Sequence, residues 1–217
     1  MSAGTSDARA RVLADIRKSL GRSSAAGADI VPLGGNAPRP AFGGDLVEHF
    51  TAKMLEKSAT LTRLATLGEA GAEVERYLAS GGAGRKVCVS KALAEIAWPP
   101  GFEIEHRAAV REDETSVTPC FAAVAEAGSI VTLSGAGTPS TLNFVPENHI
   151  VIVHASQVVR HIEDVWAQWR ASGQAMPRSV NIISGPSRTA DIEQTLVLGA
   201  HGPYRVHVVL VSDPAAN

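Results

Sequence analysis

The stretch 179–203 constrains the fold of this chain more than any other part of the sequence. It begins with a β-branched run, 180–183, which predicts a short buried strand. Small and turn-forming residues follow, and then apolar residues at helical spacing predict a helix that ends at Gly199. A further apolar run at 206–211 predicts a second strand. We therefore predict a strand–turn–helix–strand unit, whose turn lies where ligands bind in open α/β sheets.

Helices and strands are expected to alternate through the rest of the chain. Amphipathic periodicity predicts helices over 45–57, 69–79, 90–97 and 158–171. Apolar and β-branched runs predict strands over 60–64, 87–90, 102–106 and 149–154. Two more apolar runs, 121–125 and 130–134, are separated by a turn of hairpin length. This alternation predicts an α/β fold built on an open, mostly parallel sheet with helices on both faces, from which the hairpin departs.

The N-terminal part of the chain has a different character. Residues 7–20 are amphipathic and predict a helix, whereas 22–44 are rich in Gly, Ala, Ser and Pro, as in a flexible linker. We divide the chain into an N-terminal helix (1–21), a linker (22–44) and an α/β domain (45–217). The helix is either an arm that packs on a neighbour or partner, or an element that folds back on its own domain.

The composition excludes several classes of protein. A hydrophobic content of 45% supports a large core, and a net charge of −2 gives no electrostatic reason to expect nucleic acid as a partner. No apolar run approaches the roughly 20 residues of a membrane span, and the N-terminus does not resemble a secretory signal, so we expect a cytoplasmic protein. Cys88 and Cys120 lie in apolar, strand-like settings and are expected to be buried thiols. Because the histidines are scattered as well, we predict no metal site and no cofactor in this chain.

The turn 184–189 is the first candidate for a ligand site. It offers hydroxyls, backbone N–H groups at an expected helix start and the Arg188 guanidinium, which together favour an anion. Asp191 and Glu193 would already complement the helix dipole, so we expect Arg188 to supply the anion affinity. The alternative is helix capping by the hydroxyls together with an Arg188 salt bridge. The predicted ligand-binding residues here are Ser184, Gly185, Ser187, Arg188, Thr189 and His201, the last returning to the same end of the sheet.

Two further turns could contribute to a site. Glu126 lies in a small-residue turn between two buried strands, where a partly desolvated carboxylate could act as base, nucleophile or hydrogen-bond acceptor. Gly128 and Ser129 complete that turn, and the alternative is a solvent-facing hairpin turn. Gly135 belongs to a small-residue loop that would let a ligand approach the backbone. That loop lacks the third glycine of the dinucleotide fingerprint, so a flexible loop is the alternative.

Several of these segments resemble one known family. The run Ser184-Gly-Pro-Ser-Arg-Thr-Ala-Asp-Ile-Glu193, followed by Leu198-Gly-Ala-His-Gly-Pro203, resembles the end of LUD-domain proteins, specifically the lactate utilization protein C group (LutC/YkgG). Ala125-Glu-Ala-Gly-Ser-Ile-Val131 and Pro146-Glu-Asn-His149 resemble two further segments of that family. One departure is Ala127, where the family usually has threonine.

The resemblance implies a Rossmann-like sheet of the NagB/RpiA/CoA-transferase type. It also implies a role in oxidising L-lactate to pyruvate, as part of a dehydrogenase or oxidase complex with iron–sulfur partner proteins that would carry the clusters. We hypothesise a cluster-free subunit that binds a small carboxylate near Arg188, with or without forming a homo-oligomer. The alternatives are a free-standing CoA-transferase-like enzyme with Glu126 as acyl acceptor, or an anion- or acyl-CoA-binding protein without chemistry.

Overall fold

The computed structural model describes residues 3–21, 39–192, 195–199 and 201–212, without the side chains of 3–6, 189–192 and 195–198. The chain divides into two units, 1–39 and 40–217. In the first, α1 (Ala3–Ser19) forms over the predicted helix, with an Arg11–Asp7 ion pair of 2.6 Å on its surface. Most of the predicted linker, 22–38, lies outside the described residues, and the domain boundaries stay predictions.

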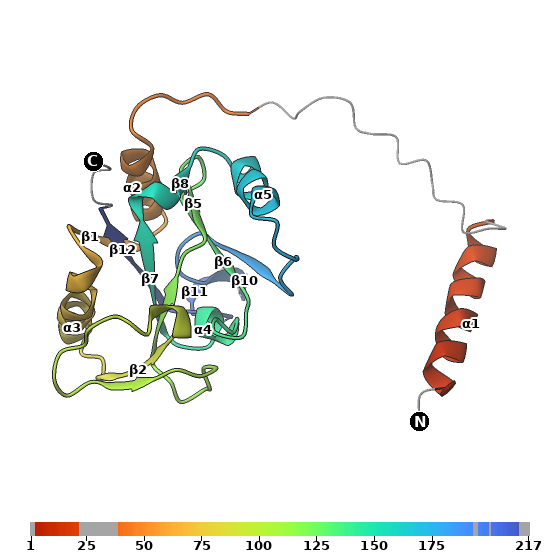
Figure 1. Ribbon diagram of the computed structural model, residues 1–217, viewed down its shortest axis with the longest axis horizontal. Helices are drawn as coiled ribbons and strands as arrows, with labels where there is room; N and C mark the ends of the chain where they lie inside the picture. Colours follow the sequence, from red (N-terminus) through yellow and green to blue (C-terminus); the bar gives the residue numbers. More distant parts are fainter. Residues whose placement is uncertain (1–2, 22–38, 193–194, 200, 213–217) are drawn as a thin grey trace. The chain divides into compact units, whose positions relative to one another are not determined.

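The second unit is built on a six-stranded sheet in which all neighbouring strands are parallel (Figure 1). The strands, in their order across the sheet, are β1 (Thr60–Leu64), β12 (Arg205–Val211), β7 (Asn148–His154), β4 (Thr115–Pro119), β2 (Lys86–Val89) and β3 (Glu103–Glu105). Two helices pack on opposite faces, α2 (Leu46–Glu56) and α3 (Ala70–Gly81). The predicted open, parallel sheet with helices on both faces is therefore confirmed.

Each helix is tied to the sheet by a small set of buried apolar side chains. In α2, Phe50 and Met54 are completely buried and share a core with Val151 of β7. The helix is capped by Asp45, whose carboxylate accepts hydrogen bonds from the Val47 and Glu48 N–H groups at 2.8 and 3.0 Å, as an N-cap residue does. In α3, Val74 and Leu78 pack on the opposite face of the sheet. Burial of these faces, more than helix propensity, holds both helices in place.

A second, four-stranded sheet covers the α2 face. Its strands, in order, are β8 (Val158–Val159), β5 (Ala122–Val124), β6 (Ser129–Leu133) and β9 (Val180–Ile183). The β5–β6 pair is the predicted antiparallel hairpin. The inner face contributes Ile130 to the core that contains α2, and the outer face packs Val131 against α5 (Ile162–Ala171). The predicted helix over 158–171 therefore starts later than expected, because 158–159 pair as a strand with β5.

Short elements connect these layers. They are the 3₁₀ turns η1 (Leu67–Glu69), η2 (Lys91–Leu93) and η3 (Ala155–Gln157) and the single-turn helix α4 (Thr141–Phe144). The helix predicted over 90–97 is thus only the 3₁₀ turn η2. Its Ser90 side chain accepts the Ala92 N–H at 3.3 Å, which satisfies the backbone locally without a longer helix.

The helix predicted after Ser187 is wrong. The chain forms an antiparallel pair there, β10 (Arg188–Ile192) and β11 (Thr195–Leu198). Isoleucine, valine and two threonines make these segments rich in β-branched residues, which favour strands over helices. Asp191 therefore lies in a strand rather than a first helical turn, and Glu193 lies outside the described residues. With no helix at this turn, the dipole argument for an anion site does not apply.

Two buried histidines lie on neighbouring strands of the parallel sheet. His149 on β7 is fully buried, and its Nε2 lies 2.8 Å from the Thr118 hydroxyl oxygen of β4. His207 on β12 is 2% exposed, with its Nδ1 2.7 Å from the Thr60 hydroxyl oxygen of β1. Burial lowers the pKa of His149 to about 3 and that of His207 to about 4, although Glu73 partly opposes the shift of His207. Both side chains are therefore neutral at pH 7.

Candidate functional site

Two of the predicted site turns lie side by side and pack against α2. The Ser129 and Ser184 hydroxyl oxygens are 2.6 Å apart and join the β5–β6 turn to the end of β9. Gly128 has a φ of +53°, and a Cβ there would lie 2.4 Å from the Lys53 Cβ. Gly185 has a φ of +92°, and a Cβ there would lie 2.6 Å from the Lys57 carbonyl oxygen. Both glycines are required by backbone conformation and by the close approach of α2.

Arg188 is also directed at α2. Its Nη2 donates to the Lys57 carbonyl oxygen at 2.9 Å and to the Ser58 hydroxyl. Lys57 in turn donates from its ammonium to the Ala127 carbonyl oxygen. A guanidinium at the carboxyl end of a helix satisfies free carbonyls and complements the helix dipole. These contacts give Arg188 a capping role, and anion binding by Arg188 stays a prediction.

Glu126 is held by the start of α5. Its Oε2 lies 2.6 Å from the His161 Nδ1, and its Oε1 accepts the Ile162 N–H at 3.0 Å. Burial raises the pKa of Glu126, but the hydrogen bonds from His161 and Ile162 outweigh it and hold the pKa below the usual value. A carboxylate with both oxygens engaged at a helix start has the geometry of a cap. Its use as a base or nucleophile stays a prediction.

Replacing Glu126 with glutamine separates these two roles. If the carboxylate is structural, Glu126→Gln should lower the free energy of unfolding by roughly 1–3 kcal/mol at pH 7, because the charge-assisted bond to His161 is lost. This contribution is present above the unfolded-state pKa and disappears as the pH falls through the lowered folded pKa, so variant and wild type should converge in acid. Urea unfolding at several pH values measures it. Unchanged stability at pH 7 would contradict the capping role.

A cleft of about 250 Å³ opens beside the 184–187 turn. It groups three segments that are distant in sequence, and its lining includes Ser184, Gly185, Ser187, His201 and Asn143. Ser187 links the segments, because its N–H donates to the Pro203 carbonyl oxygen at 2.9 Å. The structure thus brings four of the predicted ligand-binding residues to one cleft, with His201 exposed at its edge.

Asn143 is the member of this cleft that sequence reasoning missed. It is 1% exposed, its Nδ2 donates to the Thr132 hydroxyl at 2.9 Å, and its Oδ1 has no hydrogen-bond partner among the described residues. A buried acceptor without a partner costs about 1–3 kcal/mol. No sequence signal points to it, because its single-turn helix is too short to show a periodicity.

The cleft lies at the amino-terminal edge of the parallel sheet. Gly202 and Pro203 come just before β12, and Asn143 and Phe144 come shortly before β7. The strand that leads into the turn, β9, belongs to the second sheet. The expectation that this turn lies at the carboxyl end of a parallel strand is therefore wrong.

The remaining predicted residues lie elsewhere. Gly135 exchanges two backbone hydrogen bonds of 3.1 Å with Thr138, in a loop near the carboxyl end of β2. It lines a different cleft, which it shares with Arg178 and Ser140. Thr189 lies in β10, and its side chain is outside the described part of the structure.

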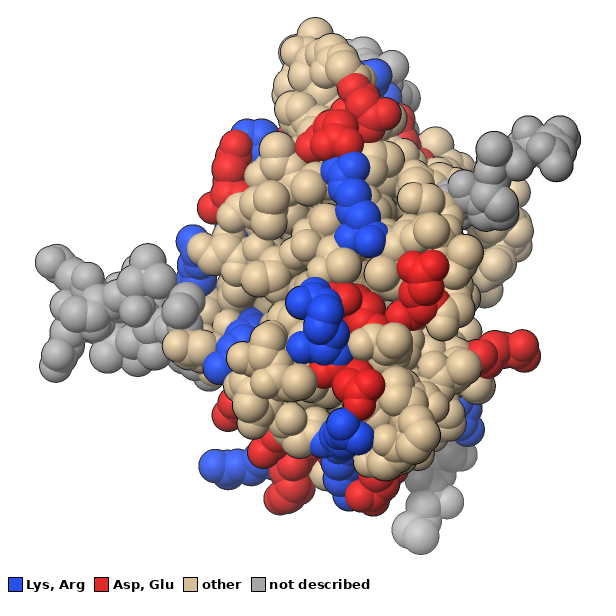
Figure 2. Space-filling view, turned by 90° about the vertical axis from the view of Figure 1, so that its left-hand side faces the viewer, with Lys and Arg blue, Asp and Glu red and all other residues tan. Residues whose placement is uncertain are grey.

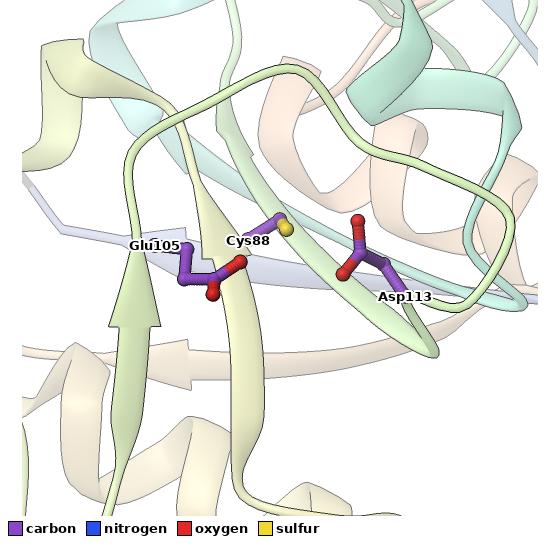
Figure 3. A group of neighbouring side chains, drawn as sticks. All are labelled: Cys88, Glu105 and Asp113. Carbon is purple, nitrogen blue, oxygen red and sulfur yellow. The ribbon is translucent and has the colours of Figure 1, made fainter.

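Cys88, Glu105 and Asp113 form a group of possible metal ligands, whose ligand atoms lie within 4.8 Å of one another (Figure 3). Arg107 donates to both Asp113 oxygens, at 2.6 and 2.8 Å, and also contacts Glu105. These bonds hold the pKa of Asp113 far below its usual range. Burial and the hydrogen bond to Asp113 raise the pKa of the Cys88 thiol to about 12. We interpret the group as an arginine-centred structural cluster, because the guanidinium already compensates the carboxylates.

Both cysteines are free and buried, as the sequence predicts. Burial raises the pKa of Cys120 to about 12, so neither thiol is ionised at pH 7. On the face shown in Figure 2, acidic and basic side chains are interspersed, without a broad patch of one sign. Among the described residues no helix is long and apolar enough to cross a membrane.

Comparison with known proteins decides the family. The LUD domain family matches residues 103–211, which is half of the chain and includes the β5–β6 turn and the cleft segments. The chain belongs to the LUD domain family. This confirms the resemblance found in the sequence.

Curated relatives carry one recurring name. The chain is 40% identical over 93 residues to lactate utilization protein C of Halalkalibacterium halodurans, covering 42% of this chain and 40% of that protein. It is 39% identical over 114 residues to lactate utilization protein C of an Exiguobacterium species, covering 51% and 49%. It is 31% identical over 121 residues to the uncharacterized protein YkgG of Escherichia coli, covering 54% and 52%. The chain thus spans about half the length of the curated relatives it matches.

A solved structure supports the architecture. The crystal structure of a DUF162 family protein from Deinococcus radiodurans superimposes with a TM-score of 0.56 at 21% sequence identity. The match covers 76% of this chain and 96% of that one. At this identity, the likeness supports the fold alone.

Proposed function

We propose that this LUD domain protein acts in lactate utilization, as a subunit without iron–sulfur clusters in a system that oxidises L-lactate to pyruvate. The observation that carries the proposal is the family match over 103–211, together with relatives named lactate utilization protein C. Oxidation of lactate to pyruvate releases two electrons, which an acceptor must take up. We propose that iron–sulfur partner proteins supply that acceptor.

The cysteines of this chain support the proposal that its partners hold the iron–sulfur clusters. A cluster bound entirely by cysteine needs four thiolates, whereas the whole sequence has two cysteines. Both are buried thiols with pKa values raised to about 12, which disfavours the thiolate form that binds iron. Clusters in such a system would therefore be held by the partners.

The cleft beside the 184–187 turn is our candidate for the binding of a small carboxylate. Within the described residues, the Ser187 hydroxyl and the His201 imidazole have no hydrogen-bond partner, so both are available to a ligand. Asn143 lines the same cleft, and its buried Oδ1 is an acceptor without a partner among the described residues. We place the carboxylate here rather than on Arg188, whose Nη2 is engaged by Lys57 and Ser58 at the end of α2. The CoA-transferase-like alternative has no comparable support, because both oxygens of Glu126 are engaged.

Anaerobic co-expression tests the proposed assembly. We expect the tagged chain to retain the iron–sulfur proteins encoded beside a lactate utilization protein C gene, and the complex to elute as one species in size-exclusion chromatography. An unrelated α/β protein with the same tag is the control. Clean separation of the chain from cluster-loaded partners would contradict the partnership.

A further inference from the structure

The order in which strands are added to the parallel sheet changes direction at β2. From β2 the chain adds β3 on one side, and the next strand of this sheet, β4, lies on the other side of β2. In open α/β sheets, ligands bind outside the carboxyl ends of the strands at such a switch point. This edge is opposite to the amino-terminal edge, which carries the cleft beside the 184–187 turn. A site at this edge would therefore be separate from that cleft.

A cleft of about 250 Å³ lies at this edge. Lys91 follows the end of β2 by two residues, and His106 directly follows β3. The opposite wall is the loop of Ala136 and Gly137. The cleft lining contains Lys91, His106 and Arg107 but no acidic side chain. Its local charge is therefore positive or neutral, in a chain whose net charge is −2.

The loop wall is fixed to the end of β2. The buried Ser90 hydroxyl donates to the Gly137 carbonyl oxygen at 2.9 Å, and the Lys91 N–H donates to the same oxygen at 2.9 Å. The backbones of Gly135 and Thr138 hydrogen-bond to each other. The N–H groups of Ala136 and Gly137, which lie between them, have no hydrogen-bond acceptor among the described residues. Successive free N–H groups in a turn are suited to an anion.

The cleft lining also contributes side chains that can bind an anion. The His106 Nδ1 lies 3.0 Å from the Val89 carbonyl oxygen, which can only accept, so Nδ1 carries a proton and Nε2 is left for a ligand. Nε2 donates to a phosphoryl oxygen when the ring is doubly protonated, and accepts from a phosphoryl hydroxyl when it is not. The Lys91 ammonium has no ion-pair partner among the described residues, whereas both arms of Arg107 are bound to Asp113. Lysine acts on phosphate as a point charge, and the free N–H groups of the loop would add directional contacts.

We propose that this cleft binds the phosphoryl group of a small phosphate monoester, held by Lys91, His106 and the N–H groups of Ala136 and Gly137. The volume is below the usual range of whole-cofactor pockets, roughly 300–1,000 Å³, and it suits a single anionic group with the rest of the ligand outside. The site is independent of the proposed role in lactate utilization.

Titration of the full chain with inorganic phosphate and with glycerol 3-phosphate tests the proposal. In ¹H–¹⁵N spectra at low ionic strength, we expect saturable shifts of the Ala136 and Gly137 amide signals. Lys91→Gln should weaken binding about tenfold or more, because a charge-assisted contact is lost. Lys53→Gln, which removes one equal charge from α2, should change affinity by less than about twofold, since Lys53 does not line the cleft and is paired with Glu56 at 2.9 Å.

Several outcomes would overturn the assignment. They are the absence of saturable shifts in the wild type, shifts confined to other amides, and equal losses in the Lys91→Gln and Lys53→Gln variants. Malonate binding in this cleft as tightly as phosphate would overturn the phosphoryl class. The amide mapping uses the wild-type chain, so it decides the location of the site even if Lys91→Gln fails to fold.

Discussion

Replacing Gly128 with alanine should lower the free energy of unfolding by roughly 2–4 kcal/mol, because the added methyl group meets α2 and the backbone has a positive φ. The new Cβ would lie 2.4 Å from the Lys53 Cβ, 2.7 Å from the Lys53 carbonyl carbon and 2.9 Å from the Met54 nitrogen. Two of these atoms belong to the α2 backbone, so the clash cannot be relieved by rotating a side chain. The helix or the hairpin turn has to move, and the packing of Met54 is lost with it.

A matched variant separates this clash from backbone strain. Gly173 also has a positive φ, +65°, but a Cβ there would meet nothing within 4 Å. Gly173→Ala should therefore cost only the strain of a left-handed residue, about 1–2 kcal/mol. Denaturant unfolding of both variants measures the difference. If Gly128→Ala were no more destabilising than Gly173→Ala, the close packing of the β5–β6 turn on α2 would be incorrect.

Acid should destabilise the fold steeply, because His149 and His207 are buried as neutral side chains. In the unfolded chain both gain a proton near pH 6.5, whereas in the folded chain their pKa values are lowered to about 3 and about 4. Between pH 6.5 and 4 the unfolded state binds more protons, so stability falls as the pH falls. Each histidine contributes a slope of about 1.4 kcal/mol per pH unit in this window.

His149 is the cleaner of the two for a test, because Glu73 lies 3.4 Å from the His207 Nε2 and would pair with it once it is charged. His149→Gln removes the titrating group and keeps a polar partner for Thr118. We expect the variant to lose about 1.4 kcal/mol per pH unit of the slope between pH 6 and 4. Urea unfolding at three pH values in that range measures it. Equal slopes in variant and wild type would show that His149 is not held neutral.

The overall architecture followed from the alternation of segments. The strand predicted at 149–154 is a central strand because its β-branched residues are buried on both faces of the sheet. The β5–β6 hairpin could also be predicted from the sequence, because the turn between its two apolar runs contains a glycine and has hairpin length. Family membership followed from the late motif, which is long enough to be specific.

The strand β4 could not be predicted from the sequence, for a local physical reason. Three of its residues, Thr115, Ser116 and Thr118, are polar and so gave no apolar run, although all three are completely buried. Their burial is made possible by partners on other elements, such as the Leu142 carbonyl oxygen, which accepts from the Ser116 hydroxyl at 2.5 Å. Such partners cannot be inferred from spacing.

The candidate site was likewise predictable in part. Ser184, Ser187 and His201 were predicted to lie together, and the structure places them around one cleft. The helix expected between them is a strand pair, because apolar residues at helical spacing were given more weight than β-branching. Asn143 could not be predicted, since only the tertiary structure leaves its Oδ1 without a partner.

Growth on L-lactate tests the proposed function most directly. The host should be a bacterial strain that requires its own lactate utilization protein C for growth on L-lactate and from which that protein has been deleted. We expect this chain to restore growth on L-lactate, and a Ser187→Ala/Asn143→Leu variant to fail while still folding and accumulating. Growth on glucose is the control. If the wild-type chain accumulates in folded form together with the iron–sulfur partners and growth on L-lactate is still not restored, the proposed role in lactate utilization is wrong.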